Sequence, residues 1–286
     1  MSPPGRPKGE HRSAQREVAA GSLRSLEVFK DEEKKLPSWF EPRNILRAAV
    51  PAAVIIVWQV LSTTGVIDQL LFPSPITVLE GLVHLVKSGA LADAIPASLA
   101  RGVTGLVLGL VIGITCGAIA GLFRIGDELL DANFQIIRAI PFIALVPLFV
   151  LWFGIDEQPK IILITMACIF PAYVNTYSGV RHVDPKLIEA GKVFGLNRAQ
   201  LIWRVILPMA RPAILVGIRY AMSTALLALI IAEQLNSRNG IGTIILNANS
   251  ALRIDLMISG ILIYAAIGIM IDIFMRVVER KSMPWK

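Results

Sequence analysis

Charged side chains that interrupt long apolar runs are the residues of this 286-residue sequence with the clearest chemical potential. Arg138, Arg219 and Asp272 each lie inside an apolar segment, and Glu233 lies near the end of another. Ionisable groups are costly inside a membrane, so they usually face a protein interior, a water-filled path or a partner charge. The two arginines either line a path for a small anion, or pair with Asp272 or reach the membrane interface. Because Asp272 offers a partner, pairing is the favoured interpretation.

Bond-making chemistry has no visible basis in the sequence. There is no Gly-x-x-x-x-Gly-Lys-Ser/Thr loop for nucleotide phosphates, and no nucleophile–base or paired-carboxylate constellation. The histidines are scattered and the cysteines lie singly, without metal-ligand or disulfide spacing: His11, His84, His182, Cys116 and Cys168. We therefore expect no metal site, no cofactor and no enzyme activity. Energy for any transport would come from a partner protein or from an ion gradient.

Composition indicates which elements must position these residues. A hydrophobic fraction of 55%, a mean hydropathy of +0.64 and a charged fraction of 17% are typical of an α-helical membrane protein. The net charge of +7 does not indicate nucleic-acid binding, because nine of the 28 Lys and Arg residues precede residue 45 and most others lie in alternate loops. We predict an all-α fold with six transmembrane helices, over residues 45–64, 98–123, 130–153, 160–177, 213–235 and 256–278.

The segments outside these helices differ in character. Residues 1–44 are polar and predict a largely disordered tail that ends in an interfacial patch at Trp39 and Phe40. Residues 65–97 predict an amphipathic segment at the outer membrane surface, because apolar residues recur at helical spacing over 76–86. Residues 98–278 form the predicted core, which contains a polar loop at 181–212, and residues 279–286 form a short tail.

The distribution of basic residues predicts the orientation. The tail 1–44, the turn 124–131, the loop 181–212 and the end of the chain from residue 276 carry nine, one, six and four Lys or Arg. The opposite loops carry only four: Lys87, Lys160, Arg238 and Arg253. Because basic loops stay in the cytoplasm, both termini and the 181–212 loop are predicted to be cytoplasmic.

Small residues and prolines predict how two of the spans pack. Glycine recurs at every fourth residue of the second span: Gly105, Gly109, Gly113, Gly117 and Gly121. Such a stripe lets another helix approach closely, and packing within the chain is favoured over a self-dimer seam. Pro141 and Pro147 lie inside the third span, where they kink a helix that either lines a pathway or packs against its neighbours.

The polar loop 181–212 reads as two short helices around a glycine corner. Asp184 can cap the first helix, and Pro185 then occupies its first position, where a missing N–H costs nothing. Gly195 supplies the left-handed residue that ends this helix. Asn197 and Gln200 predict a capping box at the start of the second helix. Two prolines then redirect the chain into the next span: Pro208 and Pro212.

This loop resembles the signature loop of bacterial ABC importer permeases of the type I, MetI-like family. The family pattern is Glu-Ala-Ala, three residues, Gly, nine residues, Ile-x-Leu-Pro. The matching residues here are Glu189, Ala190, Gly191, Gly195, Val205, Leu207 and Pro208. Gly191 replaces the second Ala and Val205 replaces Ile. The loop also falls at the family's place, between the fourth and fifth spans.

Other motifs within about residues 60–280 are similar to the nitrate/sulfonate/taurine branch of that family. They are Ser98-Leu99-x-Arg101, Pro147-Leu148, Leu151-Trp152-Phe153-Gly154, Ala232-Glu233 and Gly240-Ile241-Gly242. Ala232-Glu233-Gln234-Leu235-Asn236 and the terminal Pro284-Trp285 look most like permeases for aliphatic sulfonates. Taurine, nitrate, bicarbonate and pyrimidine-like precursors remain open as substrates, since similar permeases carry them.

The resemblance implies a machine with several partners. Two copies of the permease would pair in the bacterial inner membrane, in contact with lipid. Each copy would dock its 184–194 helix on a cytoplasmic ATPase subunit, and a periplasmic binding protein would deliver the substrate. Glu189 would bind the ATPase or only solvate its own helix, while residues 205–208 would anchor the loop to the fifth span. Glu233 would contact the binding protein or shape an outer gate.

An ion-gradient-driven secondary transporter is the alternative from a different class. Such a protein needs no ATPase, and it is expected to show a matching pair of interrupted helices in two inverted halves. The sequence shows no such pair.

Overall fold

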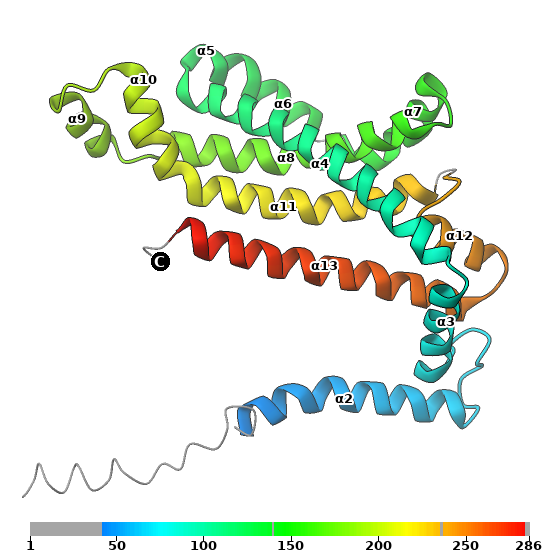
Figure 1. Cartoon of the computed structure of the whole chain (residues 1–286). Coiled ribbons are helices and arrows are strands. Elements are labelled where there is room, and N and C mark those ends of the chain that lie inside the picture. Colours follow the sequence, from blue (N-terminus) through cyan, green and yellow to red (C-terminus); the bar gives the residue numbers. More distant parts are fainter. Residues whose placement is uncertain (1–41, 139, 235–236, 284–286) are drawn as a thin grey trace, which may run out of the picture. The chain divides into compact units, whose positions relative to one another are not determined.

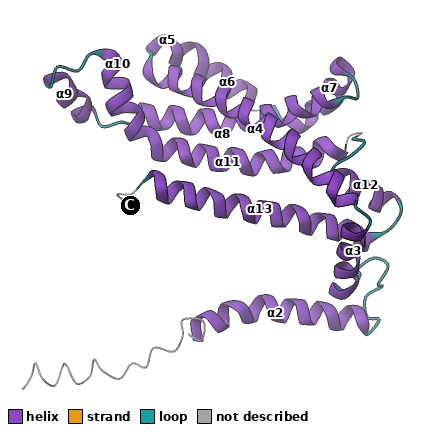
Figure 2. Cartoon of the chain, viewed as in Figure 1, coloured by secondary structure: helices purple, strands orange, loops and turns teal. Residues whose placement is uncertain are grey.

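The computed structural model describes residues 42–138, 140–234 and 237–283, and within these ranges helices are joined by turns with no strand (Figure 2). The chain divides into two units, Met1–Val57 and Trp58–Lys286. Helix α2 (Pro42–Thr63) begins in the first unit and ends in the second. The predicted tail up to residue 41, with Trp39 and Phe40, lies outside the described residues, as do Leu235, Asn236 and the Pro284-Trp285 pair.

Four helical segments are long and apolar enough to cross a membrane (Figure 1). They are α4 (Ala90–Leu122), α8 (Glu157–Arg181), the run Arg198–Gln234 and α13 (Ile254–Ser282). A fifth candidate is a bent pair, Arg124–Arg138 with Phe142–Phe153, whose two arms meet at 80°. The apolar part of α2, Ala49–Thr63, is shorter. The chain is thus a multi-pass helical membrane protein, while the count of six spans stays a prediction.

The remaining helices are short. The bent pair consists of α5 (Arg124–Gly126), the π-helical turn η1 (Asp127–Asp131), α6 (Ala132–Arg138), the 3-10 turn η2 (Phe142–Leu145) and α7 (Val146–Phe153). The other short elements are α3 (Pro75–Lys87), α9 (Pro185–Val193), α10 (Arg198–Leu201), the π-helical turn η3 (Ile202–Ile206) and α12 (Ile241–Ser250). Helix α11 (Leu207–Gln234) follows η3 and completes the run Arg198–Gln234.

The glycine stripe of α4 packs against α8 of the same chain (Figure 1). A Cβ atom added at Gly109 would lie 2.5 Å from Cys168 Cβ, and one added at Gly113 would lie 2.6 Å from the Ile169 carbonyl oxygen. The other stripe glycines, Gly105, Gly117 and Gly121, approach α8 as closely. Only glycine permits this separation, since any side chain would have to displace the backbone of α8.

The kinked span expected over residues 130–153 corresponds to the bent pair, which is either one broken span or a re-entrant loop. Helix α6 ends at Arg138, and Pro141 adopts an extended backbone with φ −62° and ψ 111°. Pro147 lies in the first turn of α7, where a missing N–H leaves no helical partner unsatisfied. The break therefore belongs to Pro141 and not to Pro147.

The amphipathic segment packs on α13. The side chain of Ser74 caps α3 by accepting a hydrogen bond from the Thr77 amide at 3.2 Å. Gly81 faces Ser259, whose hydroxyl lies 2.8 Å from the Val78 carbonyl oxygen and donates to it or to an equally close carbonyl of its own helix. Helix α4 begins at Ala90 and not at residue 98, so the last part of the predicted surface segment belongs to the second span.

Candidate functional site

The first helix of the 181–212 loop has the caps that its sequence predicts. Asp184 Oδ1 accepts a hydrogen bond from the Lys186 amide at 2.9 Å, and Pro185 is the first residue of α9. Gly195 has a φ of +77°, which favours glycine. The amide of Gly195 donates to Lys192 at 2.9 Å, and the amide of Leu196 donates to Gly191 at 3.1 Å. These two bonds form a Schellman motif, which fixes the direction of the chain after α9.

The second arm of the loop is longer than predicted. Asn197 and Gln200 form the expected capping box, with reciprocal hydrogen bonds of 2.9 and 3.0 Å. However, α10 is not a separate short helix, because it continues through η3 into α11 as a run of 37 residues. Pro208 and Pro212 lie inside this run and do not redirect it. In a regular helix, a proline ring crowds the carbonyl of the residue four positions earlier. For Pro208 this residue is Arg204, which lies in the wide π-helical turn.

An apolar cluster holds α9 against the second arm. Its buried members are Val180, Val183, Leu201, Ile206 and Ala210, and its partly buried members include Ile188, Val205 and Leu207. A Cβ atom at Gly191 would lie 2.7 Å from Leu201 Cδ1, so α9 and α10 touch at this point. The hairpin, defined as residues 184–208, is thus packed as a corner and not as two independent helices.

The opposite side of the hairpin is exposed. Glu189 and Ala190 are exposed on α9. Val193 and Phe194, at the corner, are 86% and 84% exposed. Two large apolar side chains are thus uncovered at a well-capped corner.

Arg219 and Asp272 form an ion pair between α11 and α13. Arg219 also lies 3.4 Å from Glu279, and Asp272 accepts from Arg276 at 2.8 Å. Arg219 and Asp272 line a groove of about 420 Å³ between the two helices. Arg138 is exposed at the end of α6, next to the break at Pro141. In the described part of the chain, Asp272 forms ion pairs with Arg219 and Arg276 but not with Arg138.

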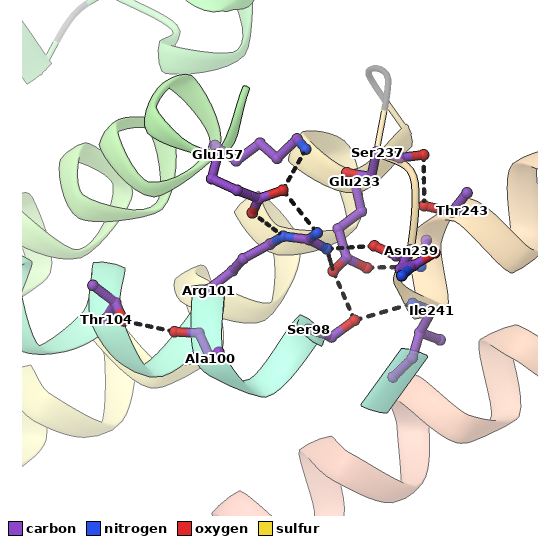
Figure 3. A network of polar contacts seen from close by, with 12 residues as sticks. Ser98, Ala100, Arg101, Thr104, Glu157, Glu233, Ser237, Asn239, Ile241 and Thr243 are labelled. Atoms are coloured by element: carbon purple, nitrogen blue, oxygen red, sulfur yellow. Dashed lines mark hydrogen bonds and ion pairs between the residues drawn. The ribbon is translucent and has the colours of Figure 1, made fainter. Parts of the chain in front are cut away.

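Glu233, at the end of α11, is completely buried (0% exposed) in a polar cluster (Figure 3). Its Oε1 accepts from Ser98 Oγ and from Arg101 Nη1, both at 2.7 Å. Its Oε2 accepts from the Gly242 amide at 2.8 Å and from the Tyr264 hydroxyl at 2.9 Å. Each carboxylate oxygen therefore has two hydrogen bonds.

Arg101, which is 7% exposed, joins Glu233 to a second carboxylate. Its guanidinium pairs with both oxygens of Glu157 at the start of α8, and it donates to the Asn239 carbonyl at 2.6 Å. Lys160 Nζ lies 3.0 Å from Glu157 Oε1. We call this set the Glu233 cluster: Ser98, Arg101, Glu157, Lys160, Glu233 and Tyr264.

Two glycines make room for the Glu233 carboxylate. A Cβ atom at Gly240 would lie 2.5 Å from Glu233 Cδ, and one at Gly242 would lie 2.7 Å from Glu233 Cβ. The motifs around Ser98, Glu233 and Gly240, noticed separately in the sequence, therefore meet in space. Glu157 and Tyr264 were missed, because neither lies in one of these motifs and only the fold brings them to Arg101 and Glu233.

Several apolar spans, a capped hairpin between two of them and an ion-paired groove define a multi-pass helical membrane protein. Residues 105–283 match the family described as "Binding-protein-dependent transport system inner membrane component", and the chain belongs to this family. It is 37% identical to the putative aliphatic sulfonates transport permease protein SsuC of Bacillus subtilis (strain 168), over 94% of this chain and 96% of that one. It is 38% identical to the protein of the same name from Escherichia coli (strain K12), over 84% and 93%.

A solved structure shares the fold. A chain of the MetNI methionine ABC transporter, crystallised in an inward-facing conformation, superposes with a TM-score of 0.57 at 19% identity. The match covers 68% of this chain and 97% of that chain. The resemblance to MetI-like importer permeases, and to the aliphatic sulfonate branch among them, is thus confirmed.

Proposed function

We propose that this ABC importer permease works as a homodimer whose two hairpins each dock on a cytoplasmic ATPase subunit. The exposed corner formed by Val193 and Phe194 carries the proposal, because it leaves large apolar side chains uncovered on a rigidly capped element. The positive-inside distribution supports cytoplasmic placement of the hairpin and of both termini, in a bacterial inner membrane. A periplasmic or lipid-anchored binding protein would deliver the substrate, and ATP hydrolysis would belong to the partner.

The second arm of the hairpin supports its role as a lever. At a rise of 1.5 Å per residue, the unbroken run of 37 residues is about 55 Å long, which exceeds the hydrocarbon thickness of a bilayer. A displacement of the corner would therefore reach the far side of the membrane through one helix. Leu207 and Pro208 lie within this helix and anchor the lever, while Glu189 and Ala190 belong to the docking side.

A negative charge introduced at the corner tests the docking proposal. In Phe194→Asp, a carboxylate replaces an aromatic ring that contacts solvent, so the fold is retained while docking fails. Central aromatic residues of interfaces contribute about 2 kcal/mol or more, so co-purification of the ATPase should fall at least roughly tenfold. Val66→Asp is the matched control, since Val66 is 72% exposed in the loop predicted to face the periplasm. Equal ATPase recovery with both variants would refute docking through this corner.

A small organic sulfonate is the proposed cargo, with taurine among the candidates and nitrate and bicarbonate as alternatives. The names of the two sulfonate permeases support this class. Selection would lie mainly in the binding protein. Titration of that protein with sulfonates, taurine, nitrate and a nucleobase tests the proposal, and tight binding of the nucleobase alone would overturn it.

The path itself is proposed to run beside the break at Pro141, with Pro147 and the exposed Arg138 near it. Arg219 is proposed to close the bundle and not to attract the anion, because Asp272 and Glu279 already offset its charge. Uptake in vesicles tests the energy source. Uptake that persisted after ATP depletion with the membrane potential maintained would favour an ion-gradient-driven transporter.

A further inference from the structure

The Glu233 cluster contains four charged side chains, of which Arg101, Lys160 and Glu233 are buried and Glu157 is half exposed. Arg101 and Lys160 are opposed by Glu157 and Glu233, so the four charges sum to zero. A buried ion pair gains little net stability over well-packed apolar residues, because each ion loses its hydration. Removing one partner is nevertheless strongly destabilising. Stability alone therefore does not account for the cluster, and its geometry suggests what else it does.

The cluster joins five helices, and Figure 3 shows its members from α4, α8, α11 and α12. Ser98 and Arg101 belong to α4, Glu157 to α8 and Tyr264 to α13. The Ser98 hydroxyl also accepts a hydrogen bond, at 3.0 Å, from the backbone amide of Ile241. Ile241 is the first residue of α12. Every one of these contacts leads, directly or through Arg101 or Ser98, to the carboxylate of Glu233. Glu233 is the second-last residue of α11.

The other end of the same helical run is the hairpin. Arg198 begins the run beside the Schellman corner, and Gln234 ends it beside the cluster. One continuous helix thus has a docking corner at one end and a four-bonded carboxylate at the other. A helix transmits displacement along its axis because its hydrogen bonds resist stretching, but the displacement reaches neighbouring elements only where the helix is fastened to them.

We propose that Glu233 and Arg101 are positioning residues that fasten the far end of α11 to α4, α8, α12 and α13. A displacement of the hairpin then moves the predicted periplasmic ends of these helices together with α11. The inference rests on the proposed docking of the hairpin and adds the element that carries its movement to the opposite membrane face. Neither residue contacts the cargo in this arrangement.

Spin-label distances between the two copies of the permease can test the positioning role of Glu233 and Arg101 separately from the docking of the hairpin. One label is placed at Arg198→Cys, at the start of the run, and another, in a separate sample, at the exposed Ser250→Cys at the end of α12. Cys116 and Cys168 are replaced by Ala in both. The permease–ATPase complex in liposomes is measured without nucleotide and after trapping with ATP and vanadate. In the otherwise unchanged chain, both interspin distances are expected to shift.

The diagnostic variant is Arg101→Gln with Glu233→Gln. It removes one charge of each sign and leaves the Glu157–Lys160 pair, so no buried charge is stranded and the chain can fold. The shift at position 198 should persist, while the shift at position 250 should fall at least about twofold and its distribution should broaden. Tyr264→Phe removes a single hydrogen bond to Glu233 and should give a smaller reduction of the same kind.

The control is a more exposed ion pair near the junction of α12 and α13. Arg253 and Asp255 form that pair at 2.7 Å, and Arg253→Gln with Asp255→Asn should leave both shifts unchanged. A full shift at position 250 in the folded Arg101→Gln, Glu233→Gln complex would overturn the positioning role alone. Absence of any shift at position 198 in the unchanged chain would instead overturn the docking on which it rests.

Discussion

The close contact between α4 and α8 makes a quantitative prediction about Gly113. A Cβ atom in Gly113→Ala would lie 2.6 Å from the Ile169 carbonyl oxygen and 2.7 Å from Ala172 Cβ. The first neighbour is backbone, so the contact can relax only if the two helices separate. Overpacking of this kind costs about 1–3 kcal/mol. The same substitution at Gly102 places its Cβ atom 3.4 Å from the flexible Leu229 side chain, which is an ordinary contact.

The two variants form a matched pair because they lie on one helix. Alanine is favoured over glycine in a helix by about 1 kcal/mol, and this gain applies to both positions, so it cancels in their difference. We expect Gly113→Ala to unfold about 2–12 °C below Gly102→Ala, since 1 kcal/mol shifts the Tm of a domain of comparable size by about 2–4 °C. Thermal unfolding of the dispersed monomer in detergent is the assay. Equal Tm values would refute close packing within one chain, and a difference confined to the dimer would indicate a self-dimer seam.

Three further substitutions should change stability in a stated direction, measured by hydrogen exchange, by the yield of folded protein and by thermal unfolding. Asn197→Ala removes the capping box, so the start of α10 should lose about 1 kcal/mol of local protection from exchange. Gly240→Ala should give little folded protein, because its Cβ atom would lie 2.5 Å from the buried Glu233 carboxylate carbon, whereas Gly154→Ala at another positive φ has open space. Thr176→Val should raise the Tm, because the buried Thr176 hydroxyl has no hydrogen-bond partner in the described part of the chain. Unchanged hydrogen exchange in Asn197→Ala, a normal yield of Gly240→Ala or a lowered Tm of Thr176→Val would contradict the respective expectation.

Local rules predicted the hairpin caps well. A capping oxygen, a first-turn proline and a left-handed glycine act within a few residues, so Asp184, Pro185 and Gly195 could be interpreted from sequence alone. The same local rules failed at Pro208 and Pro212. They treat proline as a point where a helix stops, but the wide turn at Ile202–Ile206 accommodates the ring of Pro208, and the helix also continues through Pro212.

Contacts between distant segments were beyond reach. Periodic glycines indicated that some helix approaches α4, but nothing in that stripe identified α8 as the partner. Glu233 and Gly240 were noticed as parts of separate motifs, yet their link through one carboxylate depends on the fold. Pro141 and Pro147 look equivalent in the sequence. Only their places relative to the helix start show that the first breaks the span and the second begins a helix.

The internal contacts constrain how a homodimer of this permease would alternate its access. The glycine stripe fastens α4 to α8 through backbone, which does not slide without losing several contacts at once. The Glu233 cluster fastens α4, α8, α11, α12 and α13 near one end. Rearrangement among these helices would have to break the buried Arg101–Glu233 ion pair, and breaking a buried pair is strongly destabilising. If the docking proposal holds, the helices within each copy move as one body, and the opening and closing of the path arise between the two copies.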